Sequence, residues 1–437
     1  MVIDVLISLF LGGLLLLSLL FYLRRLNKVS PNVSIDKVIK ESEVNKEPKT
    51  NKKAVKDWKK TAKGDTKFQF THKWLISVLK GQTGNILDFD ISSSGRHILS
   101  VGLDRSLFLW KVKEIWQKER KIVRSSVNYD HASKIKFSPD DKACIVSLGI
   151  ENTLRVMKIK KETNTYSFTT CADFPKIISA EIINIGIAST GNFIMTCHSN
   201  TTMAIWSLKG ELLQTIDTGN MVNYFGVVSP CGRFVASTGF ASDARVWFVE
   251  FDKSKTFKQV VRAYELKGHN SGILEMCFTH DSTKAATISK DGTWRLWNID
   301  IDFKFQDPLL IKTGKFEYKN SLKVHISLSV PGYCLCIAQN RDLLFVDTDH
   351  GKTIESLQDV HLDIITNLTY EPKNKIFLTS GGKHINVFND IISREVEIRH
   401  LKEKLRKCNE EKYQKQRLMD QIKEAETQLN KLTATTS

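Results

Sequence analysis

One pattern occurs seven times between residues 74 and 390, and it constrains the fold more than any other feature. Each copy has an apolar strand, a turn rich in Ser, Pro, Asp or Gly, a second apolar strand, a small turn, and a short strand ending in a large residue. Clear copies are DFDISSSGRHILSVGLDRSLFLW (88–110), IGIASTGNFIMTCHSNTTMAIW (185–206), GVVSPCGRFVASTGFASDARVW (226–247) and LEMCFTHDSTKAATISKDGTWRLW (274–297). The final residues of the seven copies recur at intervals of 41 to 50: Trp110, Met157, Trp206, Trp247, Trp297, Val346 and Phe388.

Short alternating strands repeated at this period predict an all-β fold, a seven-bladed β-propeller over residues 73–390. Each small sheet of such a ring can bury its faces only against its neighbours. The segment 73–80 (KWLISVLK) stands alone before the first complete copy, and no further strand follows Phe388. We therefore expect residues 73–80 to form the outer strand of the seventh blade and to close the ring.

One copy carries a sharper motif. Gly268-His269, followed by Asp291 and Trp297, resembles the repeat of the WD40 family, and Thr287 stands ten residues before the Trp. The resemblance implies a buried hydrogen-bond network of structural role, whose four members are His269, Thr287, Asp291 and Trp297. Other copies depart from the motif: the first has Gly81-Gln82 where the family has Gly-His, and the second and sixth end in Met157 and Val346. In those blades we expect apolar packing alone.

Residues 1–26 contain an apolar segment. Val5 to Leu23 are nineteen consecutive residues without a charge, which at 1.5 Å per residue approaches the ~30 Å thickness of a bilayer core. The run is longer than the core of a signal peptide, with no charged segment before it and no cleavage motif after it. We predict an uncleaved transmembrane signal-anchor. Arg24, Arg25 and Lys28 follow it, so the positive-inside rule places the bulk of the chain in the cytosol.

The length of this span favours one membrane. Nineteen residues suit the thinner endoplasmic-reticulum bilayer better than a plasma membrane, so we expect a single-pass protein of the endoplasmic reticulum. Sequons at Asn32, Asn200 and Asn367 would accept glycans only if the residues after the anchor lay in the lumen.

Residues 27–72 are predicted to be a basic flexible linker, because they hold too few large apolar residues to fold alone. The formal net charge of the chain is +16, and residues 24–73, with 15 basic and 6 acidic side chains, supply +9 of it. Six lysines cluster around Trp58: Lys52, Lys53, Lys56, Lys59, Lys60 and Lys63. They can bind RNA or anionic lipid headgroups, or they can be a solvated spacer.

Residues 391–437 are predicted to form a helical or coiled-coil tail. Between Ile392 and Leu432 there is no Gly or Pro, and apolar residues recur every three or four positions. A single amphipathic helix of this kind needs a partner. It either folds back on the propeller or allows self-association.

The sequence carries no motif for catalysis, metal binding or a phosphate cofactor. His280-Asp281-Ser282 has the residue types of a catalytic triad, but neighbours on one turn do not converge. The closest cysteines, Cys334 and Cys336, are two apart in an apolar run, which favours reduced core thiols over a disulfide framework. We therefore expect a non-enzyme without cofactors. Loop residues such as Arg105, Lys290 and Arg341 do not reveal which face binds.

The order of anchor, lysine-rich tether, seven blades and helical tail resembles the membrane-anchored branch of the WD40 family. The resemblance is carried by residues 186–196 (GIASTGNFIMT), 229–237 (SPCGRFVAS), 265–269 (ELKGH) and 289–297 (SKDGTWRLW). It implies residence in the endoplasmic-reticulum membrane, and a scaffold that links the translation kinase of the unfolded protein response with RNA or ribosomes. The alternative is the substrate-reading subunit of a ligase or trafficking complex, since propellers serve those roles too.

Overall fold

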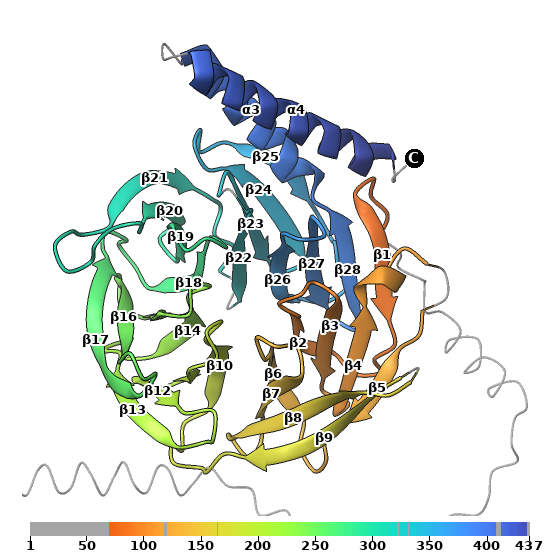
Figure 1. The fold of residues 1–437 in the computed structure, drawn as a ribbon, viewed down its shortest axis with the longest axis vertical. Coiled ribbons are helices and arrows are strands. Elements are labelled where there is room, and N and C mark those ends of the chain that lie inside the picture. Colours follow the sequence, from red (N-terminus) through yellow and green to blue (C-terminus); the bar gives the residue numbers. More distant parts are fainter. Residues whose placement is uncertain are drawn as a thin grey trace, which may run out of the picture. The chain divides into compact units, whose positions relative to one another are not determined.

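The computed structural model of the protein describes residues 70–117, 120–163, 165–320, 323–330, 332–407 and 412–434. The strands in these ranges form seven four-stranded antiparallel sheets around a ring (Figure 1). The seven-bladed, all-β propeller predicted from the repeat is confirmed. The inner strands β2, β6, β10, β14, β18, β22 and β26 surround the ring's centre.

We number the blades 1 to 7 along the chain. Blades 1 to 3 consist of β2 (Ile86–Ile91), β3 (His97–Gly102), β4 (Ser106–Lys111), β5 (Val123–Ser126); β6 (Ala132–Phe137), β7 (Ala143–Leu148), β8 (Leu154–Lys161), β9 (Tyr166–Asp173); β10 (Ile182–Ile187), β11 (Ile194–His198), β12 (Thr202–Trp206), β13 (Leu212–Asp217). Blades 4 and 5 consist of β14 (Asn223–Val228), β15 (Phe234–Gly239), β16 (Ala244–Phe251), β17 (Phe257–Leu266); β18 (Ile273–Phe278), β19 (Lys284–Ser289), β20 (Thr293–Asn298), β21 (Leu309–Lys315). Blades 6 and 7 consist of β22 (Val324–Leu328), β23 (Cys334–Gln339), β24 (Asp342–Asp347), β25 (Thr353–Leu357); β26 (Ile365–Glu371), β27 (Ile376–Gly381), β28 (His384–Asn389), β1 (Leu75–Lys80).

The local sequence explains why each blade turns where it does. In blade 4 the turn Ser229–Gly232 separates β14 from β15, and Gly232 adopts a positive φ of 70°, which glycine tolerates without steric cost. The Gly232 N–H donates to the Ser229 carbonyl at 2.8 Å. The Ser229 hydroxyl accepts the Phe234 N–H at 3.0 Å and so fixes the start of the next strand.

Apolar side chains join each blade to the next. Between blades 5 and 6, Trp294 and Leu296 of β20 share one buried cluster with Leu335 of β23. Each such side chain contributes roughly 1.5–3 kcal/mol of hydrophobic stabilisation when fully buried. The ring therefore depends on contacts between neighbouring sheets, and a sheet at the end of an open ring would leave this surface exposed.

The amino-terminal strand closes the ring as the sequence predicts. β1 pairs antiparallel with β28, from Leu75 opposite Phe388 to Lys80 opposite His384. Trp74 is 3% exposed and Leu79 is 1% exposed, so the strand brings large apolar side chains into the core. Blade 7 therefore combines both ends of the propeller sequence.

The helical tail expected at the carboxyl end is present, but it consists of two helices and not one. Two helices, α3 (Ile391–Lys407) and α4 (Lys412–Ala434), pack against each other, and Lys402 Nζ lies 2.8 Å from Glu426 Oε1. Val396 of α3 is buried, and Leu429 of α4 packs on the core cluster that contains Trp74. The helices lie along the outside of blades 6 and 7 (Figure 1). The apolar residues of the tail thus pack both between the two helices and against the propeller. Self-association through the tail stays a prediction.

The described cysteines are free thiols: Cys144, Cys171, Cys197, Cys231, Cys277, Cys334 and Cys336. Cys334 and Cys336 are buried on β23, and burial raises the pKa of the Cys336 thiol well above its ordinary value. Within the part of the chain that the structure describes, no helix is both long and apolar enough to cross a membrane. The expected signal-anchor at 1–26 and the six linker lysines lie outside the described residues.

Candidate functional site

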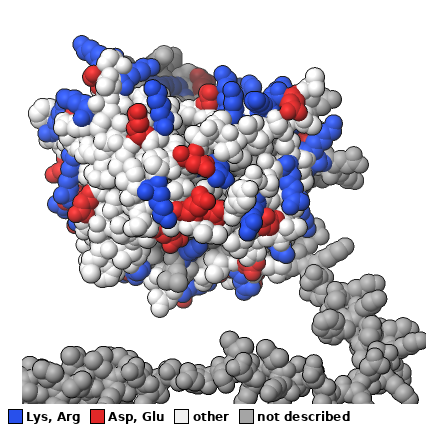
Figure 2. Space-filling view, turned by 90° about the horizontal axis from the view of Figure 1, so that it is seen from below, with Lys and Arg blue, Asp and Glu red and all other residues white. Residues whose placement is uncertain are grey.

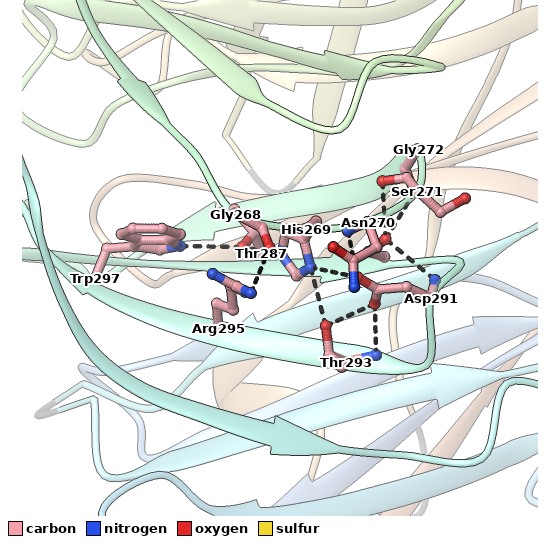
Figure 3. Close-up of polar contacts among 11 residues, drawn as sticks. Gly268, His269, Asn270, Ser271, Gly272, Thr287, Asp291, Thr293, Arg295 and Trp297 are labelled. Carbon is pink, nitrogen blue, oxygen red and sulfur yellow. Dashed lines mark hydrogen bonds and ion pairs between the residues drawn. The ribbon is translucent and has the colours of Figure 1, made fainter.

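Blade 5 contains a continuous chain of polar contacts between its outer Trp and its loops (Figure 3). The indole N–H of Trp297 donates to Thr287 Oγ1 at 3.1 Å, and Thr287 Oγ1 lies 2.8 Å from His269 Nε2. On the other side of the imidazole, His269 Nδ1 lies 3.3 Å from Asp291 Oδ2 and 3.0 Å from Thr293 Oγ1. The structure therefore brings together the four residues singled out in the sequence, and it adds Thr293.

The surroundings fix the charge states of His269 and Asp291 in this network. Burial lowers the pKa of His269 to about 4, so the imidazole is neutral at physiological pH. Burial alone would raise the pKa of Asp291, but hydrogen bonds from Thr293 and the Asn270 N–H outweigh it and hold that pKa below its ordinary value. A neutral imidazole that accepts from Thr287 at Nε2 must carry its proton on Nδ1, where it faces Asp291.

This network of hydrogen bonds holds two loops together. Asp291 Oδ2 accepts the Asn270 N–H at 2.8 Å, and Asp291 Oδ1 accepts the Thr293 N–H at 2.8 Å. The loop that enters β18 and the turn between β19 and β20 are thereby tied to each other. The network acts as a support for the loops of blade 5.

The expectation that the first blade is held by apolar packing alone is wrong. The Trp110 indole N–H donates to Ser100 Oγ at 3.1 Å, and Gln82 Nε2 contacts Ser106 Oγ at 3.4 Å. Asp104 accepts the N–H groups of Thr83 and Gly84, as Asp291 does for its own loop. Gln82 and Ser100 stand where blade 5 has His269 and Thr287, Ser106 stands where it has Thr293, and the polar support remains.

Two other blades contain partial versions of the chain. In blade 3 the Trp206 indole donates to Thr196 Oγ1 at 2.9 Å, and that hydroxyl lies 3.0 Å from His198 Nε2. In blade 7, His361 Nε2 lies 2.8 Å from Thr379 Oγ1. The sequence reasoning missed these pairs and the Ser100–Trp110 pair. The available signal was the spacing of ten residues from hydroxyl to Trp in blades 1, 3 and 5.

The supported loops lie on one face of the ring. In blades 1 to 5 the turn between the second and third strands bonds to the loop that enters the first strand: for example, the Leu103 N–H donates to Asn85 O at 2.9 Å and the Phe240 N–H to Val222 O at 3.0 Å. We call the surface made by these loops the loop face. Among the described residues, nine large apolar side chains are exposed on it: Leu103, Tyr129, Ile150, Ile177, Met221, Val222, Phe240, Leu362 and Ile364.

Two hollows open on the loop face. A groove of about 590 Å³ lies at blade 6 beside Leu362 and Ile364, and polar groups of Lys319, Arg341 and Asp342 also line it. A second hollow of about 420 Å³ lies where the inner strands begin, at the mouth of the central channel, and Leu103 forms part of its rim. Concave surface next to exposed apolar side chains is typical of a binding surface for another macromolecule.

The basic loop residues considered in the sequence also lie on this face, in different roles. Lys290 Nζ donates to Tyr224 Oη at 2.9 Å and lies 4.2 Å from the centre of that ring. Arg341 pairs with Asp359 at 2.9 Å on the wall of the groove. Arg105 is exposed in a turn with a φ of 60°.

The triad-like run His280-Asp281-Ser282 forms a turn. Asp281 Oδ1 accepts from the Thr279 hydroxyl at 2.6 Å and from the Thr283 N–H at 3.1 Å. The Ser282 hydroxyl accepts the Cys231 N–H at 2.9 Å. The Asp and Ser side chains are thus engaged with backbone and threonine groups, and they do not meet at a common point as catalysis would require.

Comparison with known proteins agrees with this architecture. The WD domain, G-beta repeat, matches residues 73–111 and 261–298. Human transducin beta-like protein 2 is 40% identical over 369 residues, which are 84% of this chain and 82% of that protein, and the mouse protein is 39% identical over 368 residues. The nuclear distribution protein PAC1 of Arthroderma benhamiae is 24% identical over 327 residues, 68% of this chain and 57% of that protein.

The family has a general mode of action. WD40 propellers mediate protein interactions and typically act as scaffolds without catalysis of their own. The identity to the human and mouse relatives extends over most of both chains. The chain therefore belongs to the transducin beta-like protein 2 family of WD40-repeat proteins.

Proposed function

We propose that this chain is an adaptor tethered to the endoplasmic-reticulum membrane, with its propeller in the cytosol. The observation that carries the adaptor role is the loop face, whose described residues include nine large exposed apolar side chains, three of which line its two hollows. Apolar side chains gathered around concave surface are typical of protein interfaces, in which a few buried anchors supply most of the affinity. The tether is supported by the uncharged run from Val5 to Leu23 and the basic residues after it.

The distribution of charge separates two kinds of partner. Residues 74–390 carry 38 basic and 33 acidic side chains, against 15 and 6 in residues 24–73. Figure 2 views the ring from its side, and basic and acidic side chains are interspersed on that surface. The nearly balanced charge of the propeller therefore suits a protein partner, and the linker lysines suit a polyanion such as RNA.

The specific form of the proposal names the partners. The protein partner is the translation kinase of the unfolded protein response, and the RNA is ribosomal or bound to ribosomes. The motivation is the family resemblance together with the expected membrane residence.

Proximity labelling in cells under reticulum stress tests the proposal. Met221→Glu with Phe240→Asp places two charges on the loop face, and we expect loss of the kinase and of ribosome-associated proteins from the labelled set. Leu309→Asp with Ile311→Glu is the matched control, because these residues are also exposed but lie on β21. Deletion of residues 1–23 should remove partners acquired by location alone. An unchanged set in the loop-face variant would exclude this face as the binding surface.

The salt dependence of RNA binding tests the role of the linker. If the six lysines each contact a phosphate, the affinity for RNA should fall by about 10³-fold as the salt concentration rises from ~50 to ~200 mM. Substitution of the six lysines by Gln should abolish this dependence. RNA binding that is equally strong in the substituted chain would contradict the role of the linker.

The alternative function is the substrate-reading subunit of a ligase or trafficking complex. The groove of about 590 Å³ on the loop face would suit a short peptide segment of a substrate. Labelling that recovers ubiquitin-ligase or coat subunits, and neither the kinase nor ribosomal proteins, would favour this alternative.

A further inference from the structure

Two histidines and one carboxylate meet where α3 contacts blade 6, away from the loop face. Asp347 ends β24, His350 lies in the turn before β25, and His400 lies on α3. His400 Nε2 is 3.1 Å from Asp347 Oδ1, and His350 Nδ1 is 3.0 Å from Asp347 Oδ2. One atom from each residue lies within 4.8 Å of the others. The side chains of Asp347 and His400 are almost fully buried, at 2% and 3% exposure.

The second nitrogen of each imidazole also faces a carboxylate. His400 Nδ1 lies 2.7 Å from Asp349 Oδ2, and His350 Nε2 lies 3.4 Å from Glu403 Oε2. Histidines that bind a metal through one nitrogen almost always donate the other N–H to a carboxylate, a carbonyl or water. Both imidazoles therefore have the outer partners of metal ligands, and their inner nitrogens converge on one carboxylate.

While both imidazoles are neutral, hydrogen bonds cannot satisfy all four contacts between the two histidines and the carboxylates. A neutral imidazole has one N–H, so it can donate to one of its two carboxylates and must direct a lone pair at the other. Two added protons would remove this conflict, and so would one divalent cation. In the second case each N–H points to Asp349 or Glu403, and the lone pairs and Asp347 bind the cation.

Charged groups of both signs surround the cluster. The carboxylates of Asp347, Asp349 and Glu403 carry three negative charges. Arg399 lies at 3.6 Å from Asp347 and is half exposed, and the charges of Lys284 and Lys404 act on Asp349. Lys404 donates to Tyr333 Oη at 2.8 Å, and the Tyr333 ring stacks on His400 with the ring centres 4.6 Å apart. These three cations offset the carboxylate charge, so the convergence of the three ligands, and not a net negative charge, indicates a metal.

We propose that Asp347, His350 and His400 bind one divalent transition-metal ion of the zinc class. Two imidazole nitrogens and a carboxylate oxygen are the ligands that Zn²⁺ accepts, and three protein ligands leave a fourth position for water. His350 lies on a turn and is 40% exposed, so it can adjust to the short metal bonds. Because the ligands come from both blade 6 and α3, the bound ion fastens the helical hairpin to the ring.

Metal titration of the untagged, full-length chain in detergent tests the site. Zn²⁺ is titrated in competition with a chromophoric chelator, and Co²⁺ is used to observe the d–d absorption of a nitrogen- and oxygen-coordinated site. We expect one equivalent of tight binding. His350→Gln and His400→Gln should each weaken it at least 100-fold. Asp349→Asn removes an outer partner and should weaken it about 10- to 100-fold.

His280→Gln is the matched control, because His280 is an exposed histidine on the same ring and should leave binding unchanged. His350→Gln also guards against misfolding, since its side chain is the most exposed of the three ligands. Hydrogen exchange of α3 should slow when Zn²⁺ is added to the wild-type chain and should not change in the His350 variant. Absence of stoichiometric binding would overturn the proposal, and so would equal affinities in the wild-type, His350 and His400 proteins. Helix docking that depends on His400 but not on metal would show a contact held by protons alone.

Discussion

Leu75 faces Phe388 across the antiparallel pair of β1 and β28, so a residue near the start of the described chain lies beside one near the end of the propeller. This pairing closes blade 7 and buries Trp74 and Leu79. The stability of the whole ring should therefore depend on residues that precede the first repeat.

Removal of β1 should destabilise the propeller. Fragment 81–437 lacks the strand and fragment 70–437 retains it. Loss of buried Trp74 and Leu79 alone should cost several kcal/mol, because removal of one large core side chain typically costs 2–5 kcal/mol. Urea unfolding of both fragments measures the difference. If the two fragments unfold at the same urea concentration, β1 does not contribute to closure.

Thr287→Val should destabilise blade 5. The substitution removes the acceptor of the Trp297 N–H and the donor to His269 inside a fully buried site, which costs about 1–3 kcal/mol. Thr313→Val, on the exposed side of β21, should change the free energy of unfolding by less than about 0.5 kcal/mol. The two variants make the same chemical change, so equal effects would show that the network adds nothing.

Gly314→Ala should destabilise the packing between blades 5 and 6. A methyl group at Gly314 would overlap the indole of Trp294, which is fully buried. Overpacking of this kind costs about 1–3 kcal/mol. Lys315→Ala, at the exposed neighbouring position, is the control. Thermal unfolding curves compare the two variants, and an unchanged melting temperature for Gly314→Ala would show that Trp294 can move at no cost.

The ring should lose stability in mild acid. Burial lowers the pKa of His361 to about 3 and that of His269 to about 4, whereas an unfolded histidine titrates near ~6.5. Between these values the unfolded chain binds more protons than the folded chain. The stabilisation is complete above about pH 6.5 and is lost as the pH falls towards 4, by up to about 2 kcal/mol per histidine between about pH 7 and 5. Urea midpoints against pH should show a shallower slope in the double variant His269→Gln, His361→Gln; an identical slope would assign the acid sensitivity to other groups.

Glycosylation should report which side of the membrane the ring occupies. Asn367 Nδ2 donates to Asp88 Oδ1 at 2.6 Å and to Phe89 O at 3.0 Å, whereas Asn200 is exposed. With the ring in the cytosol, endoglycosidase should not change the mass of the native chain. As a control, residues 70–437 sent to the lumen by a signal peptide should be glycosylated at Asn200 and should lose the glycan in Asn200→Gln. A mass shift at Asn200 in the native chain would reverse the proposed orientation.

The sequence predicted the fold well because the repeat is local. The seven large residues from Trp110 to Phe388 all lie in the third strand of their blades, including Met157 and Val346, which depart from the family motif. Each copy contains its own alternation of apolar residues and its own turn residues, so its strands form even where a single motif residue is replaced. The closing strand was predictable for a related reason, since one apolar segment had no partner in its own copy.

The sites were less predictable because they depend on contacts between copies. His350 and His400 meet Asp347 only after α3 folds onto blade 6, and no spacing in the sequence brings them together. The loop face gathers Tyr129, Met221 and Phe240 from different blades for the same reason. The division of the tail into α3 and α4 was missed because the apolar spacing continues on both sides of the break.

The position of β1 has a mechanical consequence. This strand follows directly after the amino-terminal region and also forms the outer strand of the last blade. A force applied along that region acts first on the pairing of β1 with β28. A protease that cuts inside β1 separates the amino-terminal region from the propeller and opens the ring in one event. A detached but intact ring can arise only from a cut upstream of Trp74.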